Sequence, residues 1–267
     1  MSLARTLLAS DLDGTLIPLE RTPTRLQEVH GLVAAIEGTR DLGLAYVTGR
    51  HLALAEEGIA EVGLPAPDWF VCDVGTSVYR RRGSRYELDP TYRAAMKAAF
   101  GGLTGDQVRV AVGELEGIEL QEEDKQADFK VSYYTEGRPE PFVDVVRSRL
   151  AVAGAKVNLI ASFDPVSGRG LLDALPAGIA KDYAVRYLHD RAGIEEDHLV
   201  YAGDSGNDRA AMLAGYRAIV VGNADAALKE DLVAASAARG IAERIYFAKQ
   251  AYAAGVLEGL RYFGFVG

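Results

Sequence analysis

The sequence predicts an α/β fold with a parallel sheet and a smaller α+β domain inserted into it. Near both ends of the chain, almost continuous apolar runs alternate with segments of helical periodicity. The middle of the chain carries short runs of alternating residues instead. Continuous apolar runs are typical of strands buried on both faces, whereas alternation is typical of strands with one face toward water. We therefore expect a core made of residues 1–83 and 174–267, and an inserted domain over residues 84–173.

The first part of the core has the order strand, helix, strand, helix, strand. The apolar runs TLLASD, LGLAYV and DWFVCDVG predict the three strands, at residues 6–11, 44–47 and 68–75. Between them, apolar residues spaced as on one helical face predict helices over residues 25–39 and 51–63. Strands that alternate with helices in this way form a parallel sheet covered on both faces.

The same order returns after the insertion. We expect a helix over residues 180–193, a strand over 198–204, a helix over 207–216 and a strand over 217–223. The last segment, 249–267, has an amphipathic pattern with an aromatic end and predicts a closing helix.

The inserted domain is predicted from its alternating runs. Residues 106–113, 117–123, 128–137 and 154–162 predict strands, and residues 91–102 and 139–154 predict helices. In one run, Val131 and Tyr133 alternate with Lys130, Ser132 and Tyr134, which predicts a sheet with one face toward water.

Composition excludes several classes of partner. The 267 residues carry a net charge of −9, which argues against binding to nucleic acid or to an anionic membrane, because phosphate-rich surfaces require Lys and Arg. The one cysteine, Cys72, excludes an internal disulfide and a cysteine-rich metal site. No apolar run approaches the ~20 residues of a membrane helix. We expect a cytoplasmic protein, a monomer or small homo-oligomer, whose partner is a small molecule.

Four polar stretches stand where ligands of open parallel sheets bind, beyond the carboxyl ends of the strands. They are Asp11-Leu12-Asp13-Gly14-Thr15 after the first strand, Thr48-Gly49-Arg50 after the second, Lys181 at a late helix start, and Gly203-Asp204-Ser205-Gly206-Asn207-Asp208 after a late strand. Together they supply carboxylates, an ammonium group, hydroxyls and turn glycines, which are the groups that phosphoryl transfer needs.

The carboxylates predict a nucleophile, an acid and a metal site. Asp11 can attack phosphorus and form an aspartyl-phosphate. A bend at Gly14 can bring Asp13 above it as the general acid and base. Crowded carboxylates need a hard dication, and Mg²⁺ is the usual one beside phosphate. The candidate metal ligands are Asp11, Asp13, Asp204 and Asp208, of which Asp208 either contacts the ion or caps the next helix.

The cationic and hydroxyl groups predict a phosphate site. Thr48, with the backbone N–H groups of Gly49 and Arg50, precedes a helix start, which is a ready site for an anion. Lys181 offers a point charge to the phosphoryl oxygens. Asn207 either caps its helix or hydrogen-bonds the phosphate. The catalytic candidates are thus Asp11, Asp13, Thr48 and Lys181.

The order DLDGT, VTGR, lysine, GDSGND resembles the four motifs of the haloacid-dehalogenase (HAD) superfamily of phosphatases. The resemblance implies a HAD-like Rossmannoid core with a cap inserted between the second and third motifs. The segments FKVSYY, KDYAVRYL and AIVVGNA are similar to the sucrose-phosphatase branch, and the related mannosylfructose-phosphate phosphatases share several of them. This resemblance implies that the cap recognises the sugar and that Lys130 and Ser132 contact the sugar.

The resulting hypothesis is a Mg²⁺-dependent phosphatase of a phosphorylated sugar, such as the disaccharide sucrose-6-phosphate. Mannosylfructose, glucosylglycerol and other sugar phosphates are open alternatives. A phosphosugar mutase is disfavoured, because the roughly 30 residues between Asp13 and Thr48 hold one helix and its connections but no cap. A catalytically silent protein that kept the fold is a further alternative. Taken singly, each stretch also has a structural explanation as a turn, a helix cap or a solvated strand face.

Overall fold

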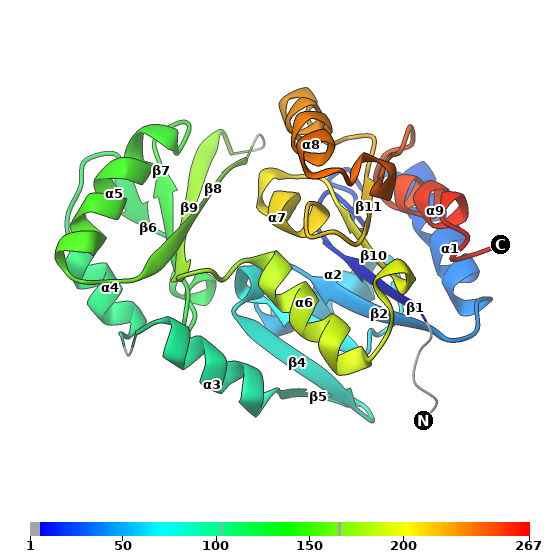
Figure 1. Ribbon diagram of the computed structural model, residues 1–267, viewed down its shortest axis with the longest axis horizontal. Coiled ribbons are helices and arrows are strands. Elements are labelled where there is room, and N and C mark those ends of the chain that lie inside the picture. The colour runs from blue at the N-terminus through cyan, green and yellow to red at the C-terminus, as the bar shows by residue number, and fades with distance from the viewer. Residues whose placement is uncertain (1–5, 102, 165–166) are drawn as a thin grey trace.

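The structure is a computed structural model that describes residues 6–101, 103–164 and 167–267. It has two parts, each built on its own sheet: a core with an eight-stranded sheet and a cap with a four-stranded sheet (Figure 1). The cap is formed by the middle of the chain, between two segments of core. The predicted α/β fold with an inserted α+β cap is confirmed.

The core sheet is mostly parallel. Its strand order is β12-β11-β10-β1-β2-β3-β4-β5, with parallel pairing from β12 to β3 and antiparallel pairing of β4 and β5 at one edge. These strands are β1 (Thr6–Ser10), β2 (Leu42–Val47), β3 (Trp69–Cys72), β4 (Ser77–Arg82), β5 (Arg85–Leu88), β10 (Leu199–Gly203), β11 (Arg217–Val220) and β12 (Ile245–Phe247).

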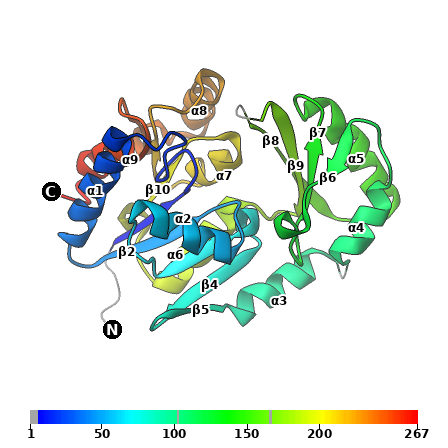
Figure 2. The same ribbon diagram turned by 180° about the vertical axis from the view of Figure 1, so that it is seen from behind.

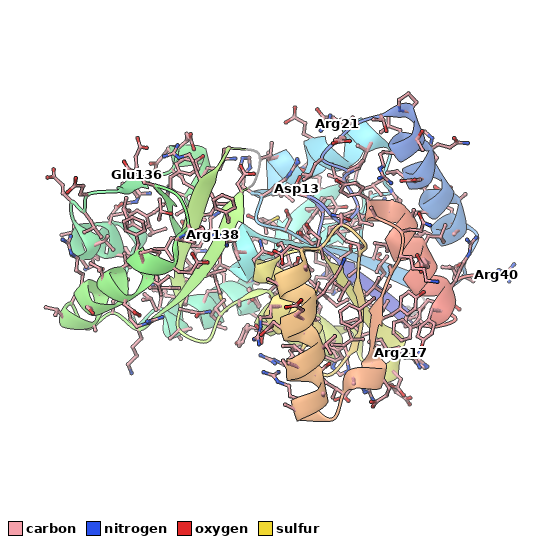
Figure 3. All side chains as sticks on the ribbon, turned by 90° about the horizontal axis from the view of Figure 1, so that it is seen from above. Asp13, Arg21, Arg40, Glu136, Arg138 and Arg217 are labelled. Carbon is pink, nitrogen blue, oxygen red and sulfur yellow. The ribbon has the colours of Figure 1, made fainter. Side chains whose placement is uncertain are left out.

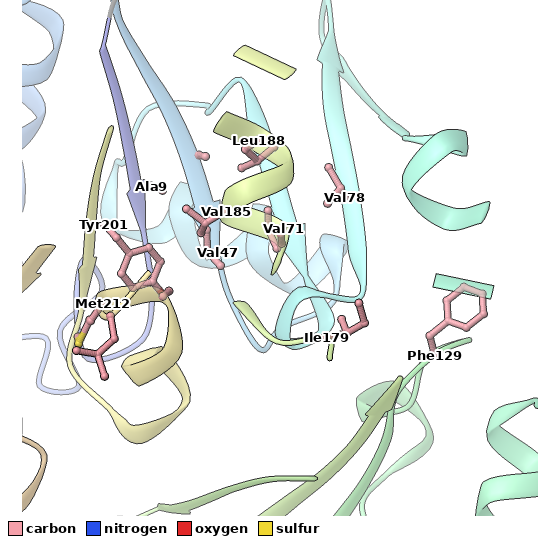
Figure 4. Close-up of a cluster of buried hydrophobic side chains, with 14 of the residues drawn as sticks. Ala9, Val47, Val71, Val78, Phe129, Ile179, Val185, Leu188, Tyr201 and Met212 are labelled. Carbon is pink, nitrogen blue, oxygen red and sulfur yellow. The ribbon is translucent and has the colours of Figure 1, made fainter. Parts of the chain in front are cut away.

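Helices cover both faces of this sheet, as its apolar strands require. The side chains of β1 alternate between the two faces: Leu7 and Ala9 join one buried cluster, while Leu8 joins the other. The first cluster, drawn in Figure 4, packs under α6 (Lys181–Ala192), α7 (Arg209–Met212) and α8 (Ala226–Arg239). The second packs under α1 (Pro23–Glu37), α2 (Leu52–Val62) and α9 (Tyr252–Tyr262).

The strand order places a binding crevice at the centre of the sheet. From β1 the chain adds β2 and β3 on one side, and after the cap it adds β10, β11 and β12 on the other side. The carboxyl ends of β1 and β10 therefore flank the point where the order reverses, which is where open α/β sheets bind ligands. Both strands end directly before acidic residues, Asp11 and Asp204.

The cap is an antiparallel sheet backed by helices. Its strand order is β6-β7-β9-β8. Figure 2 shows α4 and α5 on the side of this sheet away from the core, with α3 leading from the core to the cap. The elements are α3 (Pro90–Ala99), α4 (Gly105–Val112), β6 (Ile118–Leu120), β7 (Val131–Thr135), α5 (Glu140–Val152), β8 (Val157–Asp164) and β9 (Arg169–Pro176).

The strand predicted over residues 106–113 is wrong, because this segment is helix α4. Thr104 and Gln107 form a reciprocal capping box at its start. The alternating valines misled the prediction, since Val108 and Val112 are also four residues apart and both are buried on one helical face, whereas Val110 is exposed.

The water-facing strand face predicted for Lys130 and Ser132 is also wrong. Both side chains are buried: Lys130 reaches the Gly49 carbonyl of the core, and Ser132 donates to the Lys125 carbonyl and to Asp173 within the cap. The sequence patterns also did not indicate the β4–β5 hairpin, β9, α8 or β12. The predicted domain limits remain a prediction; in the structure β5, residues 85–88, pairs in the core sheet, and β9 pairs in the cap sheet through residue 176.

Helix α3, through which the chain enters the cap domain, begins at its N-cap residue Asp89. Its carboxylate accepts hydrogen bonds from the backbone N–H groups of Thr91 and Tyr92 at 2.9 and 3.1 Å, and it pairs with Arg191. Burial alone would raise the pKa of Asp89, but the hydrogen bonds from Tyr92, Tyr187, Arg191 and Thr91 outweigh burial, and the pKa lies below its ordinary value.

We expect Asp89→Ala to lower the free energy of unfolding by about 1 kcal/mol, the usual cost of a lost cap, and Asp89→Asn to keep most of it. Because the folded pKa is lowered, the contribution of the ionised group is present above the unfolded pKa of about 3.9 and is lost as the pH falls through the folded pKa. Urea unfolding at pH 7 and pH 3 measures both effects. Asp106→Ala, in the first turn of α4, is the control; equal losses in both alanine variants would contradict the assignment.

Candidate active site

A buried lysine joins the first and last acidic stretches. The ammonium group of Lys181, at the start of α6, lies 2.9 Å from Oδ1 of Asp11 and 2.7 Å from Oδ1 of Asp208. Its side chain is fully buried. Burial by itself would lower the pKa of Lys181, but the two carboxylates outweigh it and raise the pKa above its ordinary value. Lys181 therefore stays charged and draws together groups that are almost 200 residues apart.

Asp208 holds the loop that carries Asp204. Its Oδ2 accepts hydrogen bonds from the backbone N–H groups of Asp204 and Ser205, each at 3.1 Å. Its Oδ1 accepts one from the Tyr201 hydroxyl at 2.5 Å, in addition to the contact with Lys181. A side chain at Gly203 would meet the Asp208 carboxyl carbon at 2.6 Å, so the loop closes onto this carboxylate only because Gly203 has none.

The turn at Gly14 brings the loop after β1 against Asp204. Gly14 has a φ of +77°, a left-handed conformation that glycine adopts without strain. A Cβ there would lie 2.4 Å from Oδ2 of Asp204. The next residue, Thr15, donates its hydroxyl hydrogen to Oδ1 of Asp204 at 3.0 Å. The glycine and threonine of the first motif thus position an acid of the last one.

Three carboxylates gather into one possible cation site. Asp11, Asp204 and Asp208 each offer an oxygen, and the three oxygens lie within 4.8 Å of one another. Burial, then the charge of Asp208, raises the pKa of Asp204 to about 7. Burial raises the pKa of Asp11 well above its ordinary value, although Lys181 opposes this. A hard divalent cation prefers such oxygen ligands and would offset their mutual repulsion, so the donor set fits one.

A strained turn holds the second motif against the third. Asp73 and Val74, which follow β3, have φ values of 54° and 58°, and a β-branched residue is a clear outlier in this region. The backbone N–H of Val74 donates to the Thr48 carbonyl at 3.1 Å. A Cβ on the following Gly75 would lie 2.7 Å from the carbonyl oxygen of Ala180. The strained backbone thus lets the turn fit between Thr48 and the start of α6.

Thr48 is fully buried, and its hydroxyl contacts the backbone two residues further along the chain. The backbone N–H of Arg50 donates to the Thr48 hydroxyl at 3.2 Å. Among the predicted phosphate-binding groups, Gly49 presents its carbonyl to the cap: the ammonium group of Lys130 lies 3.3 Å from it. The cap therefore contacts the second motif directly.

The structure pairs Asp13 with Arg50. The guanidinium Nε and Nη2 of Arg50 donate to the two carboxylate oxygens of Asp13 at 2.7 and 2.6 Å. Asp13, predicted as a metal ligand, thus has its carboxylate on Arg50, whereas the three-carboxylate cluster consists of Asp11, Asp204 and Asp208. Figure 3 shows Asp13 on the side of the core that faces the cap.

The remaining predicted residues lie in two places. Ser132 of β7 is fully buried and donates to Asp173 of β9 at 2.5 Å, inside the cap sheet. Asn207 lies in the 3₁₀ turn Gly206–Asp208, where its side-chain oxygen accepts from the Ser205 hydroxyl at 3.2 Å. The helix expected from residue 207 is therefore short, with α7 beginning only at Arg209.

Sequence reasoning gave no individual role to three residues that support the site: Thr15, Tyr201 and Asn223. The Asn223 side chain donates to the Gly14 carbonyl at 2.7 Å and accepts from the backbone N–H of Tyr252 at 2.9 Å, which links the first motif to the start of α9. Its position three residues after β11, in the segment AIVVGNA, was the available signal, because polar residues after core strands point to the crevice.

The comparisons with known proteins agree with this geometry. A mannosylfructose-phosphate phosphatase of Agrobacterium fabrum is 29% identical, covering 97% of this chain and 96% of its own. A glucosylglycerol-phosphate synthase of Pseudomonas anguilliseptica is 27% identical over 98% of this chain and 31% of its own. The structure of the sucrose-phosphatase of Synechocystis, in complex with sucrose and phosphate, superposes with a TM-score of 0.81 at 27% identity, covering 97% of this chain and 98% of that one.

Fold, site and comparisons together define a phosphoric monoester hydrolase of the HAD superfamily, acting on sugar phosphates. The family model of sucrose-6F-phosphate phosphohydrolase matches residues 4–264, and the chain belongs to that family. Within the described residues, no helix combines the length and apolar character needed to cross a membrane.

We expect Lys181→Met to destabilise the protein by about 3–5 kcal/mol, because it leaves the Asp11 and Asp208 carboxylates buried without a counter-charge. The loss of stability should be smaller at pH 5 than at pH 8, since protonation of a buried carboxylate removes its uncompensated negative charge. Urea unfolding of the metal-free protein at both pH values is the measurement. Lys97→Met, on the exposed side of α3, is the control; matching stabilities of the two variants would contradict the role given to Lys181.

Proposed function

We propose that this protein hydrolyses a phosphorylated disaccharide, such as sucrose-6-phosphate, through an aspartyl-phosphate on Asp11 and with Mg²⁺ as its cofactor. The observation that carries the proposal is the contact of Lys181 with both Asp11 and Asp208, beside Asp204. It places a carboxylate at the carboxyl end of β1 together with a fixed cation and a possible metal site, which is what attack on a phosphate monoester requires.

Asp11, Asp204 and Asp208 would hold the metal ion. When bound, Mg²⁺ neutralises charge on the phosphoryl group and on the carboxylates around it. Thr48, the N–H groups of Gly49 and Arg50, Lys181 and Asn207 are the proposed phosphate-binding groups. Because Lys181 is already ionised and held by two carboxylates, it needs no rearrangement to stabilise the charge of the transferred group.

The chemistry runs in two steps on the chain's own carboxylates. Asp11 attacks phosphorus, the bond between phosphorus and the sugar oxygen breaks, and Asp13 gives its proton to that oxygen. Water then attacks the phosphorus of the aspartyl-phosphate, Asp13 takes the proton of the water, and the bond to Asp11 breaks to release inorganic phosphate. The partly exposed position of Asp13 suits a group that meets both sugar and water.

The sugar is proposed to lie between core and cap. A cleft of about 430 Å³ beside Asp13 and Arg50 is lined by Arg21 and Glu57 from the core and by Lys125 from the cap. This is a usual size for a small-molecule site. The similarity to the sucrose-phosphatase and mannosylfructose-phosphate phosphatase supports a disaccharide phosphate as the substrate class. Lys130 and Ser132 are proposed to shape this site from the cap side.

We expect Asp11→Asn to abolish phosphate release while the fold survives, because the amide is a poor nucleophile but has nearly the same shape. Release of inorganic phosphate from sucrose-6-phosphate, mannosylfructose-phosphate and glucosylglycerol-phosphate measures the activity, and circular dichroism checks the fold. Activity close to that of the wild type would refute the nucleophile. An isomerised sugar phosphate in place of free phosphate would indicate a mutase.

Removal of metal should abolish turnover. We expect dialysis against a chelator to inactivate the enzyme and added Mg²⁺ to restore it. Asp204→Asn should raise the Mg²⁺ concentration for half-maximal activity about 10–100-fold, since it removes one of three charged ligands. Asp225→Asn, at the cap of α8 and apart from the acid cluster, should leave this concentration unchanged. Full activity in the chelator would contradict the metal site.

Lys130→Met should raise KM for sugar phosphates more than it raises KM for p-nitrophenyl phosphate. The reason is that Lys130 joins cap to core at Gly49, and a larger substrate depends on the closed cap. Steady-state kinetics with both substrates is the test. An equal change in both KM values would show that Lys130 acts on the phosphate site and not on cap closure.

A further inference from the structure

The protein itself holds the guanidinium group of Arg50 at each of its three nitrogens. Besides the two bonds to Asp13, its Nη1 donates to the carbonyl oxygen of Leu54 at 3.0 Å, in the first turn of α2. Each of its three nitrogens therefore has a partner within the chain. A planar guanidinium held at three points fixes the carboxylate that it grips, because both bonds of the fork must align at once.

Gly58, a buried residue one turn further along α2, makes room for this group. A Cβ at Gly58 would lie 2.3 Å from Nη1 and 3.1 Å from Cζ of Arg50. Glycine in a helix interior is destabilising by roughly 0.5–1 kcal/mol relative to alanine. Since the clashing atoms are the end of a flexible side chain, the helix accepts an alanine here only if the guanidinium moves.

We infer that Arg50, seated against Leu54 and Gly58, is a positioning residue that holds the Asp13 carboxylate in the orientation needed for the second half of the reaction. In that half, water forms a bond to phosphorus, the bond from phosphorus to the Asp11 oxygen breaks, and Asp13 accepts the proton of the water. This inference rests on the proposed function, because it takes Asp13 as the base.

The bonding pattern favours this role over direct binding of the phosphate. The three Arg50 nitrogens with bonds in the structure face Asp13 and Leu54, whereas the buried cation beside Asp11 is Lys181. Asp13 nevertheless remains open on its other side: its side chain keeps 43% of its exposure and lines the cleft assigned to the sugar. A base must be both held and reachable by water, and this arrangement meets both needs.

The test separates the two half-reactions with p-nitrophenyl phosphate, whose leaving group departs without a proton. Rapid mixing gives the rate of the first turnover, and the steady state reports hydrolysis of the aspartyl-phosphate. For Gly58→Ala and Arg50→Met we expect a first turnover within twofold of the wild type, followed by a steady-state rate about 10–100-fold lower, the usual cost of a misplaced group. KM should fall by the same factor as kcat, because an unchanged first step leaves kcat/KM unchanged.

The matched control is Gly31→Ala in α1, where a Cβ meets nothing within 4 Å. It should leave both rates unchanged. Thermal unfolding should show both alanine variants folded. An unchanged steady state in Gly58→Ala and Arg50→Met overturns the inference. So does a raised KM at constant kcat, which means that Arg50 binds substrate, or an equal loss of first turnover and steady state, which means that the site as a whole is disturbed.

Asp13→Asn, measured in parallel, distinguishes a failure of this inference from a failure of the proposed function. If Asp13→Asn turns over like the wild type, Asp13 is not the base and the proposed function fails at that residue. If Asp13→Asn gives one turnover and then stalls while Gly58→Ala does not, the proposed function stands and the role of Arg50 and Gly58 falls.

Discussion

The buried ammonium group of Lys181 is the interaction on which the rest of the site depends. It is the shared counter-charge of Asp11 and Asp208, and without it those carboxylates would be buried together with only repulsion between them. The loop that holds Asp204 is in turn fastened to Asp208 through backbone N–H groups. The ammonium group of Lys181, at the exit from the cap, thus contacts both the segment after β1 and the loop after β10.

The same contacts couple stability to function. The charges of this cluster are only partly balanced, and this lowers the stability of the folded protein. Burial of the two carboxyls raises the pKa of both Asp11 and Asp204. The turn after β3 adds backbone strain at Val74 for the sake of close contact with Thr48 and the start of α6. Such costs are typical of sites in which the groups are placed before the substrate arrives.

The cap contacts the core next to the acidic cluster. It joins the core through α3 and β9, and its face toward the core carries Lys130, whose ammonium group reaches the Gly49 carbonyl of the second motif. A contact of this kind couples the position of the cap to the segment Thr48–Arg50, where we propose that the phosphate binds. It also explains why Lys130 is buried although its spacing is typical of a solvated strand: the covering surface comes from the core.

The sequence alone determined the class of fold and which acidic residues follow the core strands. Continuous apolar runs at Leu7–Ala9 and at the other core strands required burial on both faces, and the acids directly after them had to lie at one sheet edge. It did not determine α4, because Val108 and Val112 fit a strand and a helix equally well and only packing against the cap sheet decides between them. Nor did it show that Asp13 pairs with Arg50 or that Asn223 supports Gly14, since these contacts join residues 37 and 209 positions apart. Periodicity reports which face of an element is buried; only the tertiary structure decides which distant side chain meets that face.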